Sequence, residues 1–366
     1  MDLRVATFNM ENLFTRPTAM RDGSGATGQR AIDDHAELNG IISKDTYSDH
    51  DKARLLALER RYHFADLNPP SSALVQLNKV RGQLFKRAQT GVKSVVATGR
   101  SSWTGWFELK RDDVKWTATY NTGRVIAEVN ADIIICVEIE NRPTLQRFNE
   151  QVLGAEFNCE FPHAMLIDGN DQRGIDVGIM SRYPISGMRS HVDDRNPNGE
   201  RTFSRDCPEY VIELSDDKRI VVIPNHFKSK RGGDSPAIQA RRLAQASTAS
   251  AIAKNALQVS PYVVLGGDLN DTPDSQTLQP LFLDGLQDVR THASYPTDRP
   301  GTYDTGTAAN KIDYLILSQP LQAALQVTGI ERRGSFHPRT WEPFDTVKSK
   351  ADEASDHHLL WADFSL

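Results

Sequence analysis

The sequence predicts an α/β protein built from layers of helices and strands. Short runs rich in Val, Ile and Leu recur along the chain, and segments with apolar residues at helical spacing lie between several of them. This alternation is typical of layered α/β domains. The chain has 366 residues, of which 39% are hydrophobic and 25% charged, so it has ample apolar material for a large core.

Eight short segments have the composition of strands. Several are continuous apolar runs, which predicts burial on both faces. The predicted strands are residues 3–8, 132–137, 176–180, 210–214, 220–224, 262–265, 312–317 and 359–364.

Three segments have the apolar spacing of helices. They are residues 123–130, 144–153 and 235–257. The last is rich in alanine and opens with Ser235-Pro236, a capping residue followed by proline at the first helical position.

Residues 15–120 interrupt the alternation. The segment 20–28 is rich in Gly, Ser and Thr and predicts a loop, whereas residues 71–91 predict a helix. Between positions 71 and 120, nine basic residues outnumber three acidic ones, and aromatic residues are interleaved with them. The basic residues are Lys79, Arg81, Lys86, Arg87, Lys93, Arg100, Lys110, Arg111 and Lys115; the acidic ones are Glu108, Asp112 and Asp113; the interleaved aromatic residues include Trp103, Trp106, Phe107, Trp116 and Tyr120. We predict one domain, residues 1–366, with a basic and aromatic elaboration inserted at about 15–120.

Two interpretations of this elaboration stay open. Basic and aromatic side chains can follow a nucleic-acid backbone and stack on bases. Alternatively, the tryptophans anchor a small core and the basic helix is simply solvated. The formal net charge of -5 does not exclude nucleic acid, because binding needs only a local basic face.

Other global features narrow the class of protein. Three cysteines, Cys136, Cys159 and Cys207, suggest neither a disulfide scaffold nor a cysteine-type zinc site. No apolar stretch reaches the roughly 18 residues that a membrane span needs. Because strand-like sequence begins directly after the first residues, we expect a cytoplasmic protein, unless a leader was removed. The sequence does not indicate an oligomeric state.

Polar side chains stand at or just beyond the ends of the predicted strands, where layered α/β folds place their chemistry. They are Asn9, Glu11, Glu138, Asn225, His226, Asp268, Asn270, Asp313, Asp356 and His357. Acid, amide and imidazole groups together suit the binding of a hard cation beside a phosphate. Each acid taken singly is equally typical of a helix cap or a solvent-facing side chain, so the prediction depends on their occurring together.

The segment Asp268-Leu269-Asn270 follows an apolar run and two glycines. In an extended chain, residues two apart point to the same side. A carboxylate can orient or deprotonate a water molecule, and a neighbouring amide can bind a phosphate oxygen. The alternative is a Gly-Asp turn followed by an asparagine cap.

The histidines predict a second set of roles. A buried carboxylate such as Asp313 would hold His357 in one tautomer and favour its charged form. The alternative is a hydrogen-bonded core or surface histidine, and Asp356 favours His357 over its neighbour His358. His226 precedes the basic residues Lys228 and Lys230.

The basic residues after His226 can clamp a phosphate, or they can belong to a solvated loop of mixed charge. Arg173, just before the predicted strand 176–180, is a weaker candidate for contacting an anion.

Seven short motifs, in family order, resemble the endonuclease/exonuclease/phosphatase superfamily, which includes deoxyribonuclease I, abasic-site endonucleases, sphingomyelinases and inositol-polyphosphate 5-phosphatases. The motifs are residues 7–11, 132–138, 173–181, Asn225-His226, Gly267-Asp268-Leu269-Asn270, Lys311-Ile312-Asp313-Tyr314 and Ser355-Asp356-His357. The resemblance covers residues 1–14 and 121–366. It implies a four-layer α/β sandwich with two central mixed β-sheets flanked by helices, and a phosphoesterase site that uses Mg²⁺ or Mn²⁺.

The resemblance also implies residue roles. Glu138 would be the main metal ligand, and Asn9, Glu11 and Asp356 would complete the metal environment. In the catalytic set, Asp268 would activate or orient the attacking water and Asn270 would bind the phosphate. Asp313 would orient His357, and His226 would contact the phosphate or the leaving group. Substrate contacts would come from Arg173, Asn225, Lys228 and Lys230. Glu138 stands 129 positions after Asn9, so the resemblance does not account for residues 15–120.

The function that these features favour is a metal-dependent nuclease that hydrolyses DNA or RNA by in-line attack of water. One alternative is a phosphatase or phosphodiesterase acting on a small-molecule or lipid phosphate, since a fold does not name a substrate. A second alternative is a catalytically silent interaction module, which would have lost its metal-binding positions. Those positions are all present here.

Overall fold

The computed structural model describes residues 1–11, 19, 25–63, 74–88, 91–110, 116–171, 174–196, 198–230, 233–283 and 285–366. The chain divides into two compact units. The main unit comprises Met1–Phe14 and Val114–Leu366, and the inserted unit comprises Thr15–Asp113. The insertion falls where the alternation of strands and helices is interrupted. That it elaborates a single domain stays a prediction.

Two six-stranded sheets form the centre of the main unit. The first has the order β15-β16-β1-β6-β8-β7 and the second the order β13-β14-β12-β11-β10-β9. The strands of the first are β1 Asp2–Asn9, β6 Ile133–Ile139, β7 His163–Leu166, β8 Asp176–Ser181, β15 Leu325–Glu331 and β16 Leu359–Ser365; those of the second are β9 Ile185–Arg189, β10 Glu209–Ser215, β11 Lys218–His226, β12 Val263–Asp268, β13 Gln287–Asp288 and β14 Asp313–Leu317.

The two sheets share one pattern of strand directions. In the first, β1 is parallel to β6, and in the second, β11 is parallel to β12. All the other neighbouring strands in both sheets are antiparallel. Each sheet is therefore mixed, with a single parallel pair near its middle.

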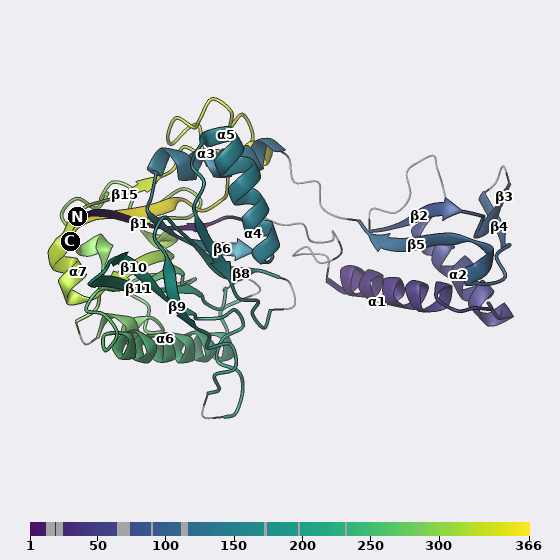
Figure 1. Ribbon diagram of the computed structural model, residues 1–366, viewed down its shortest axis with the longest axis horizontal. Helices are drawn as coiled ribbons and strands as arrows, with labels where there is room; N and C mark the ends of the chain where they lie inside the picture. Colours follow the sequence, from purple (N-terminus) through teal and green to yellow (C-terminus); the bar gives the residue numbers. More distant parts are fainter. Residues whose placement is uncertain are drawn as a thin grey trace. The chain divides into compact units, whose positions relative to one another are not determined.

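Helices cover both outer faces of the paired sheets (Figure 1). The helices of the main unit are α3 Trp116–Val129, α4 Arg142–Phe148, a π-helix Asn149–Gly154, α5 Ala155–Phe157, α6 Pro236–Ala256 and α7 Gln319–Ala324, with 3₁₀ turns at Gln279–Phe282, Val289–Thr291, Ala308–Asn310 and Lys350–Asp352. Among the described residues, no helix combines the length and apolar character needed to cross a membrane.

Three clusters of buried apolar side chains define four layers. The first lies between the sheets and joins, for example, Ile135 of β6 to Val222 of β11. The second packs α3 and α4 on the first sheet, and the third packs α6 on the second sheet. The predicted four-layer sandwich with two mixed sheets is confirmed.

The predicted elements of the main unit are largely confirmed. All eight predicted strands are present, and of the predicted helix 123–130 all but Asn130 belongs to α3. The long alanine-rich segment forms α6, where the Ser235 hydroxyl accepts a hydrogen bond from the Ile238 amide at 3.4 Å and Pro236 occupies the first helical position. Residues 144–153 are helical, but they pass from α4 into the π-helix.

The inserted unit has a core of its own. Helices α1 Gly25–Ile42 and α2 Asp49–Tyr62 pack with two antiparallel strand pairs. The pairs are β2 Val75–Arg81 with β5 Thr104–Leu109, and β3 Phe85–Ala88 with β4 Gly91–Val95, with a 3₁₀ turn at Arg100–Ser102. Trp103 is fully buried in this core and donates its indole N–H to the Tyr47 hydroxyl at 2.8 Å. This tryptophan therefore has the anchoring role of the second interpretation.

Two predictions for the inserted unit are wrong. Residues 71–91 were predicted to form a helix, but their described part forms β2 and β3. The apolar residues Val75 and Leu77 alternate with polar ones, which is the period of a strand. Gly82 then adopts φ +72°, where a Cβ would lie 2.6 Å from the Ser102 carbonyl oxygen, so a helix cannot continue. The loop predicted at 20–28 gives way to α1 from residue 25 onward, and residues 20–24 lie outside the described part.

Candidate active site

The parallel pairs bring four predicted site residues to matching strand ends. Asn9 ends β1, and Glu138 lies next to the end of the parallel strand β6. In the second sheet, His226 ends β11 and Asp268 ends β12, and the two residues are partners in register. Because the strands of each pair run in the same direction, their carboxyl ends meet at one edge of the sheet.

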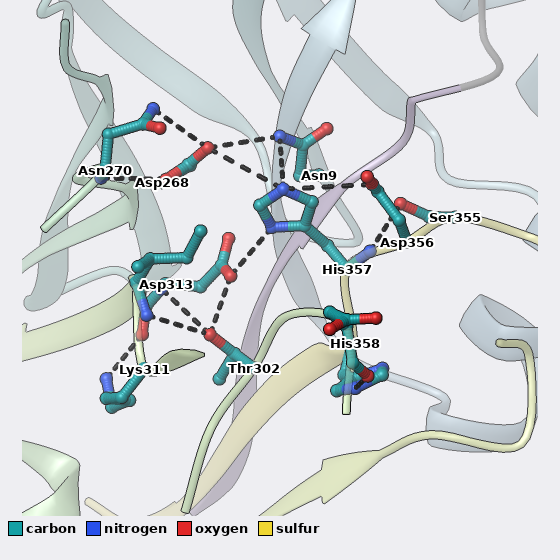
Figure 2. A network of polar contacts seen from close by, with 12 residues as sticks. Asn9, Asp268, Asn270, Thr302, Lys311, Asp313, Ser355, Asp356, His357 and His358 are labelled. Atoms are coloured by element: carbon teal, nitrogen blue, oxygen red, sulfur yellow. Dashed lines mark hydrogen bonds and ion pairs between the residues drawn. The ribbon is translucent and has the colours of Figure 1, made fainter. Parts of the chain in front are cut away.

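Antiparallel neighbours bring two further residues to the same edges. Asp313 begins β14 and pairs with Asp268. His357 stands two residues before β16, which is antiparallel to β1. The sheets then meet through side chains (Figure 2): Asn9 Nδ2 lies 3.3 Å from Asp268 Oδ2 and 3.4 Å from His357 Nε2. Residues from both sheets thus form one cluster.

His357 is held by a buried carboxylate, as predicted. Its Nδ1 lies 2.9 Å from Asp313 Oδ2, and the same oxygen accepts a hydrogen bond from the Thr302 hydroxyl at 2.7 Å. Burial alone would lower the pKa of His357, but the charge and hydrogen bond of Asp313 outweigh this effect and raise it well above its usual value. The charged form of His357 is therefore favoured, and its Nε2 faces Asp268 Oδ2 at 3.9 Å.

Asp268 is held by the residue two positions ahead. The Asn270 amide N–H donates to Asp268 Oδ1 at 2.9 Å, and Asn270 Nδ2 donates to Asp268 Oδ2 at 3.1 Å. Asn270 adopts φ 54°, a left-handed conformation that asparagine tolerates well. Burial raises the pKa of Asp268 to about 7; the positive charge of His357 opposes the rise and Asp313 adds to it.

His226 lies between two acids. Its Nε2 is 3.8 Å from Glu138 Oε1 and 3.6 Å from Asp268 Oδ2, and its side chain is buried. The preceding Asn225 is fully buried, and its Nδ2 donates to the Ile223 carbonyl at 3.0 Å. His226 is thus part of the cluster, whereas the described side-chain contacts of Asn225 are with Ile223 and Cys207.

Glu138 has an unusual backbone. Its φ is 62°, and the pairing of β6 with β8 shifts register between Val137 and Ile139. A positive φ is strained for a glutamate, and such bulges re-aim side chains near active sites. Burial raises the pKa of Glu138; His357 opposes this, Asp356 adds to it, and Arg205 opposes it.

The oxygen donors around Glu138 fit a divalent cation. The pKa of Glu11 rises to about 8 through burial, the charge and hydrogen bond of Asp356, and the charge of Glu138. The Asp356 amide N–H donates to Glu11 Oε2 at 3.3 Å. Asn9 Oδ1 is buried and accepts no hydrogen bond from the described residues. A hard cation would satisfy this oxygen and offset the repulsion among the acids.

Donor atoms of Asp268, Asp313 and His357 also lie within 4.8 Å of one another. His357 is poorly suited to bind a metal ion in this trio, because a metal ligand must be neutral imidazole and Asp313 favours its protonated form. The acids around Glu138 fit a cation better, whereas the trio suits proton transfer and charge stabilisation.

Lys228 and Lys230, two of the predicted substrate contacts, have described partners within the protein. Lys230 forms an ion pair with Asp271, which also accepts hydrogen bonds from Arg242 and Ser275. The Lys228 amide N–H donates to Gln245 Oε1 at 2.8 Å. Arg173 lies outside the described residues.

Sequence reasoning did not single out Thr302 or Arg205. Thr302 bonds the carboxylate behind His357, and the next residue, Tyr303, has its ring centroid 4.9 Å from that of His357. Arg205 is buried, its Nε lies 3.2 Å from Asp171 Oδ2, and its charge acts on Glu138. Neither residue follows a predicted strand, so no pattern marks them; a buried arginine is visible only in three dimensions.

Comparisons with known proteins agree with this architecture. The model of the Endonuclease/Exonuclease/phosphatase family matches residues 118–357. An endonuclease/exonuclease/phosphatase family protein from Leptotrichia buccalis C-1013-b is 14% identical with a TM-score of 0.50, covering 70% of this chain and 95% of that chain. The chain is also similar to truncated Caenorhabditis elegans TDP2, with a TM-score of 0.48 and 17% identity, covering 68% of this chain and 90% of that chain. It is similar as well to beta toxin from Staphylococcus aureus, with a TM-score of 0.48 and 17% identity, covering 67% of this chain and 92% of that chain. No curated protein sequence matches significantly.

The family match spans more than half of the chain, and the Leptotrichia structure shares its fold. The chain therefore belongs to the endonuclease/exonuclease/phosphatase family, whose enzymes are metal-dependent hydrolases of phosphate esters.

Proposed function

We propose that this phosphoesterase is a nuclease that hydrolyses phosphodiester bonds of DNA or RNA by in-line attack of water. The observation that carries the proposal is the single cluster in which Glu138, Asp268 and His357 approach one another from separate strand ends, with Asn9 and His226 between them. Acids on one side and a protonated imidazole on the other suit a reaction in which water attacks an anionic phosphate.

In the proposed site, Glu138 and Asn9 would hold a divalent cation, Mg²⁺ or Mn²⁺, with Glu11 and Asp356 beside it. Such an ion polarises a phosphoryl oxygen and offsets negative charge on the leaving oxygen. The oxygen-only donor set supports Mg²⁺ or Mn²⁺ over a softer metal.

The remaining residues have distinct proposed roles. Asp268, held from behind by Asn270, accepts a proton from the attacking water and fixes its direction. His357, charged through Asp313, donates a hydrogen bond from Nε2 to a phosphate oxygen as negative charge builds up. His226 reaches the same region and contacts the phosphate or the leaving group. Lys228, Lys230, Asn225 and Arg173 remain proposed substrate contacts.

A panel digest tests the proposal. Plasmid DNA, linear DNA, RNA, inositol phosphates and a small chromogenic phosphodiester are each incubated with Mg²⁺ or Mn²⁺ and with EDTA. We expect EDTA-sensitive cleavage of at least one nucleic acid and weak cleavage of the small diester. Turnover of inositol phosphates with intact nucleic acids would instead assign the chain to small-molecule phosphates and contradict the nuclease.

A further inference from the structure

We infer that the exposed strand face of the inserted unit binds single-stranded nucleic acid, with cations on the phosphates and Trp106 stacked on a base. This face comprises the outward side chains of β2, β3, β4 and β5. The inference rests on the proposed function, because it names the part of the chain that would hold the polymer. The family match begins at residue 118, so this surface lies outside the matched segment.

The register of β2 and β5 places an aromatic and a basic residue on the same outward face. Gly105, Phe107 and Leu109 of β5 point into the core, so Thr104 and Trp106 point outward. A register shift between Lys79 and Arg81 places Arg81 opposite Thr104, and Asn78 is opposite Trp106. The bulge thus turns Arg81 to the side of Trp106.

The indole of Trp106 is available to a ligand. The residue is 47% exposed, whereas Trp103 and Phe107 nearby are buried. Asn78 and Gln76 on the same face both donate hydrogen bonds to Glu108 Oε2, so the one acid of the strand pair is already engaged. An exposed indole beside an arginine is a stacking platform for an unpaired base.

Cations of the inserted unit fall into two groups. On α2 and in the turn before it, Lys44, Arg54 and Arg61 form ion pairs with Asp51, Glu37 and Asp34, each at 2.6 Å. On the strands, five exposed cations make no ion pair within the described part of the chain. They are Lys79, Arg81, Lys86, Arg87 and Lys93; of the two on β2, Arg81 shares the side of Trp106, whereas Lys79 pairs with Gly105 and belongs to the other side. Within the described residues, cations without an ion pair are therefore more numerous on the strands than on the helices, where Arg30, Lys52 and Arg60 also form none, and such charge attracts a polyanion.

Nucleic acid fits this face better than a membrane. Among the side chains of these strands that the structure describes, the large apolar ones that are exposed are Val80 and Trp106, and Val96 follows β4. They are single residues among polar ones rather than a continuous apolar patch that could insert into lipid. Asn78 and Gln76 add hydrogen-bonding groups that suit bases and sugars.

A binding measurement tests the inference without turnover. The full chain in EDTA is titrated into fluorescently labelled dT and U oligonucleotides and a duplex, and anisotropy is recorded at several salt concentrations. We expect single strands to bind more tightly than duplex, and affinity to fall steeply with salt. Reversing two strand cations, Lys86→Glu with Arg87→Glu, should weaken binding by about tenfold or more. Trp106→Ala should weaken it about fivefold, and Trp106→Phe should restore most of the loss.

The matched control changes net charge equally on the helices. Arg30 and Arg60 are exposed on α1 and α2, and Arg30→Glu with Arg60→Glu should leave affinity within about twofold of wild type. An equal loss in both double variants, or tighter binding to phosphatidylserine vesicles than to any oligonucleotide, overturns the inference. Circular dichroism confirms that each variant is folded.

The two proposals fail in different ways. If wild type binds oligonucleotides as expected but cleaves none with metal present, the nuclease is wrong and the binding surface stands. If wild type cleaves nucleic acid and the strand variants cleave and bind equally well, the binding surface is wrong and the nuclease stands.

Discussion

Asp268 and Asp271 lie three positions apart, but their surroundings shift their pKa values in opposite directions. Burial raises the pKa of Asp268 to about 7, so the fold disfavours its charge. Asp271 is also buried, but the hydrogen bonds of Lys230, Thr277 and Ser275 overcome that burial and lower its pKa to about 2. One carboxylate is poised to exchange a proton near neutral pH, and the other is a fixed structural anion.

The first prediction compares these two aspartates. Asp268→Asn removes the proposed proton acceptor, so we expect turnover to fall by about 10²–10⁴ while the free energy of unfolding stays equal to wild type or rises. Asp271→Asn leaves Lys230 and Arg242 without their anion, so it should lower the free energy of unfolding by about 2–4 kcal/mol. Urea unfolding and initial rates on a small phosphodiester measure both. Full activity in Asp268→Asn would remove this residue from the mechanism.

The second prediction concerns a buried histidine outside the active-site cluster. His191 Nδ1 lies 2.7 Å from Asp194 Oδ2, and its Nε2 lies 3.0 Å from Glu209 Oε1. Burial lowers its pKa, but the two carboxylates outweigh burial, and the folded pKa is raised. Protonation therefore favours the fold: the stabilisation is complete below the unfolded pKa of about 6.5 and is lost as pH rises through the folded pKa.

We therefore expect His191→Gln to cost about 2 kcal/mol at pH 6 and clearly less at pH 9. Chemical unfolding of wild type and variant across this range measures the difference. Exposed His50, replaced in the same way, serves as the control and should show no such trend. A difference that grows with pH would mean that His191 is neutral in the fold.

At the scale of elements, the candidate active site depends on how closely the ends of β11 and β12 approach each other. Gly267 precedes Asp268 in β12 and has φ +126°, and a Cβ there would lie 2.0 Å from the Asn225 carbonyl oxygen. The parallel pairing that places His226 beside Asp268 therefore requires glycine at this position.

The third prediction follows from this close approach. Gly267→Ala should lower the free energy of unfolding by about 3–5 kcal/mol and reduce activity, because β11 and β12 must separate. Gly187→Ala is the control, since its Cβ would lie 3.5 Å from Val211 Cγ2, an ordinary contact. Thermal unfolding of both variants provides the measurement. Equal midpoints would show that β12 can shift without cost.

The elements also show what sequence can predict. Continuous apolar runs marked the strands of the main unit, and polar residues after them marked the cluster, because both signals are local. The helix predicted at 71–91 is wrong, because Val75 and Leu77 alternate with polar residues at the period of a strand. The sequence pattern does not predict Arg205 and Thr302 as site residues, because their roles depend on contacts with residues far along the chain. The bulge at Glu138 likewise leaves no mark in the sequence.

At the scale of the whole molecule, charge is divided between the units. The chain as a whole carries -5, but the inserted unit has 16 basic and 12 acidic residues, so it is positive while the main unit is negative. The negative net charge of the full chain therefore does not reveal that the inserted unit is basic. Local charge, and not the total, decides whether a polyanion is attracted.

The last prediction concerns the independence of the main unit. Within the described part of Thr15–Asp113, no residue belongs to a strand of either six-stranded sheet or to the three apolar clusters of the sandwich. Replacing residues 15–113 by a short Gly/Ser linker should therefore leave both sheets and the active-site cluster intact. We expect a soluble protein whose melting midpoint lies within about 5 °C of wild type.

The deletion variant should hydrolyse a small phosphodiester at the wild-type rate, because every residue of the proposed site lies in the main unit. It should cleave single-stranded nucleic acid more slowly, with the loss in KM rather than kcat, since only binding of the polymer is impaired. Initial rates on both substrates decide the matter. A folded variant that has lost small-diester hydrolysis would show that the inserted unit takes part in the chemistry, and an insoluble one would show that the two units fold only together.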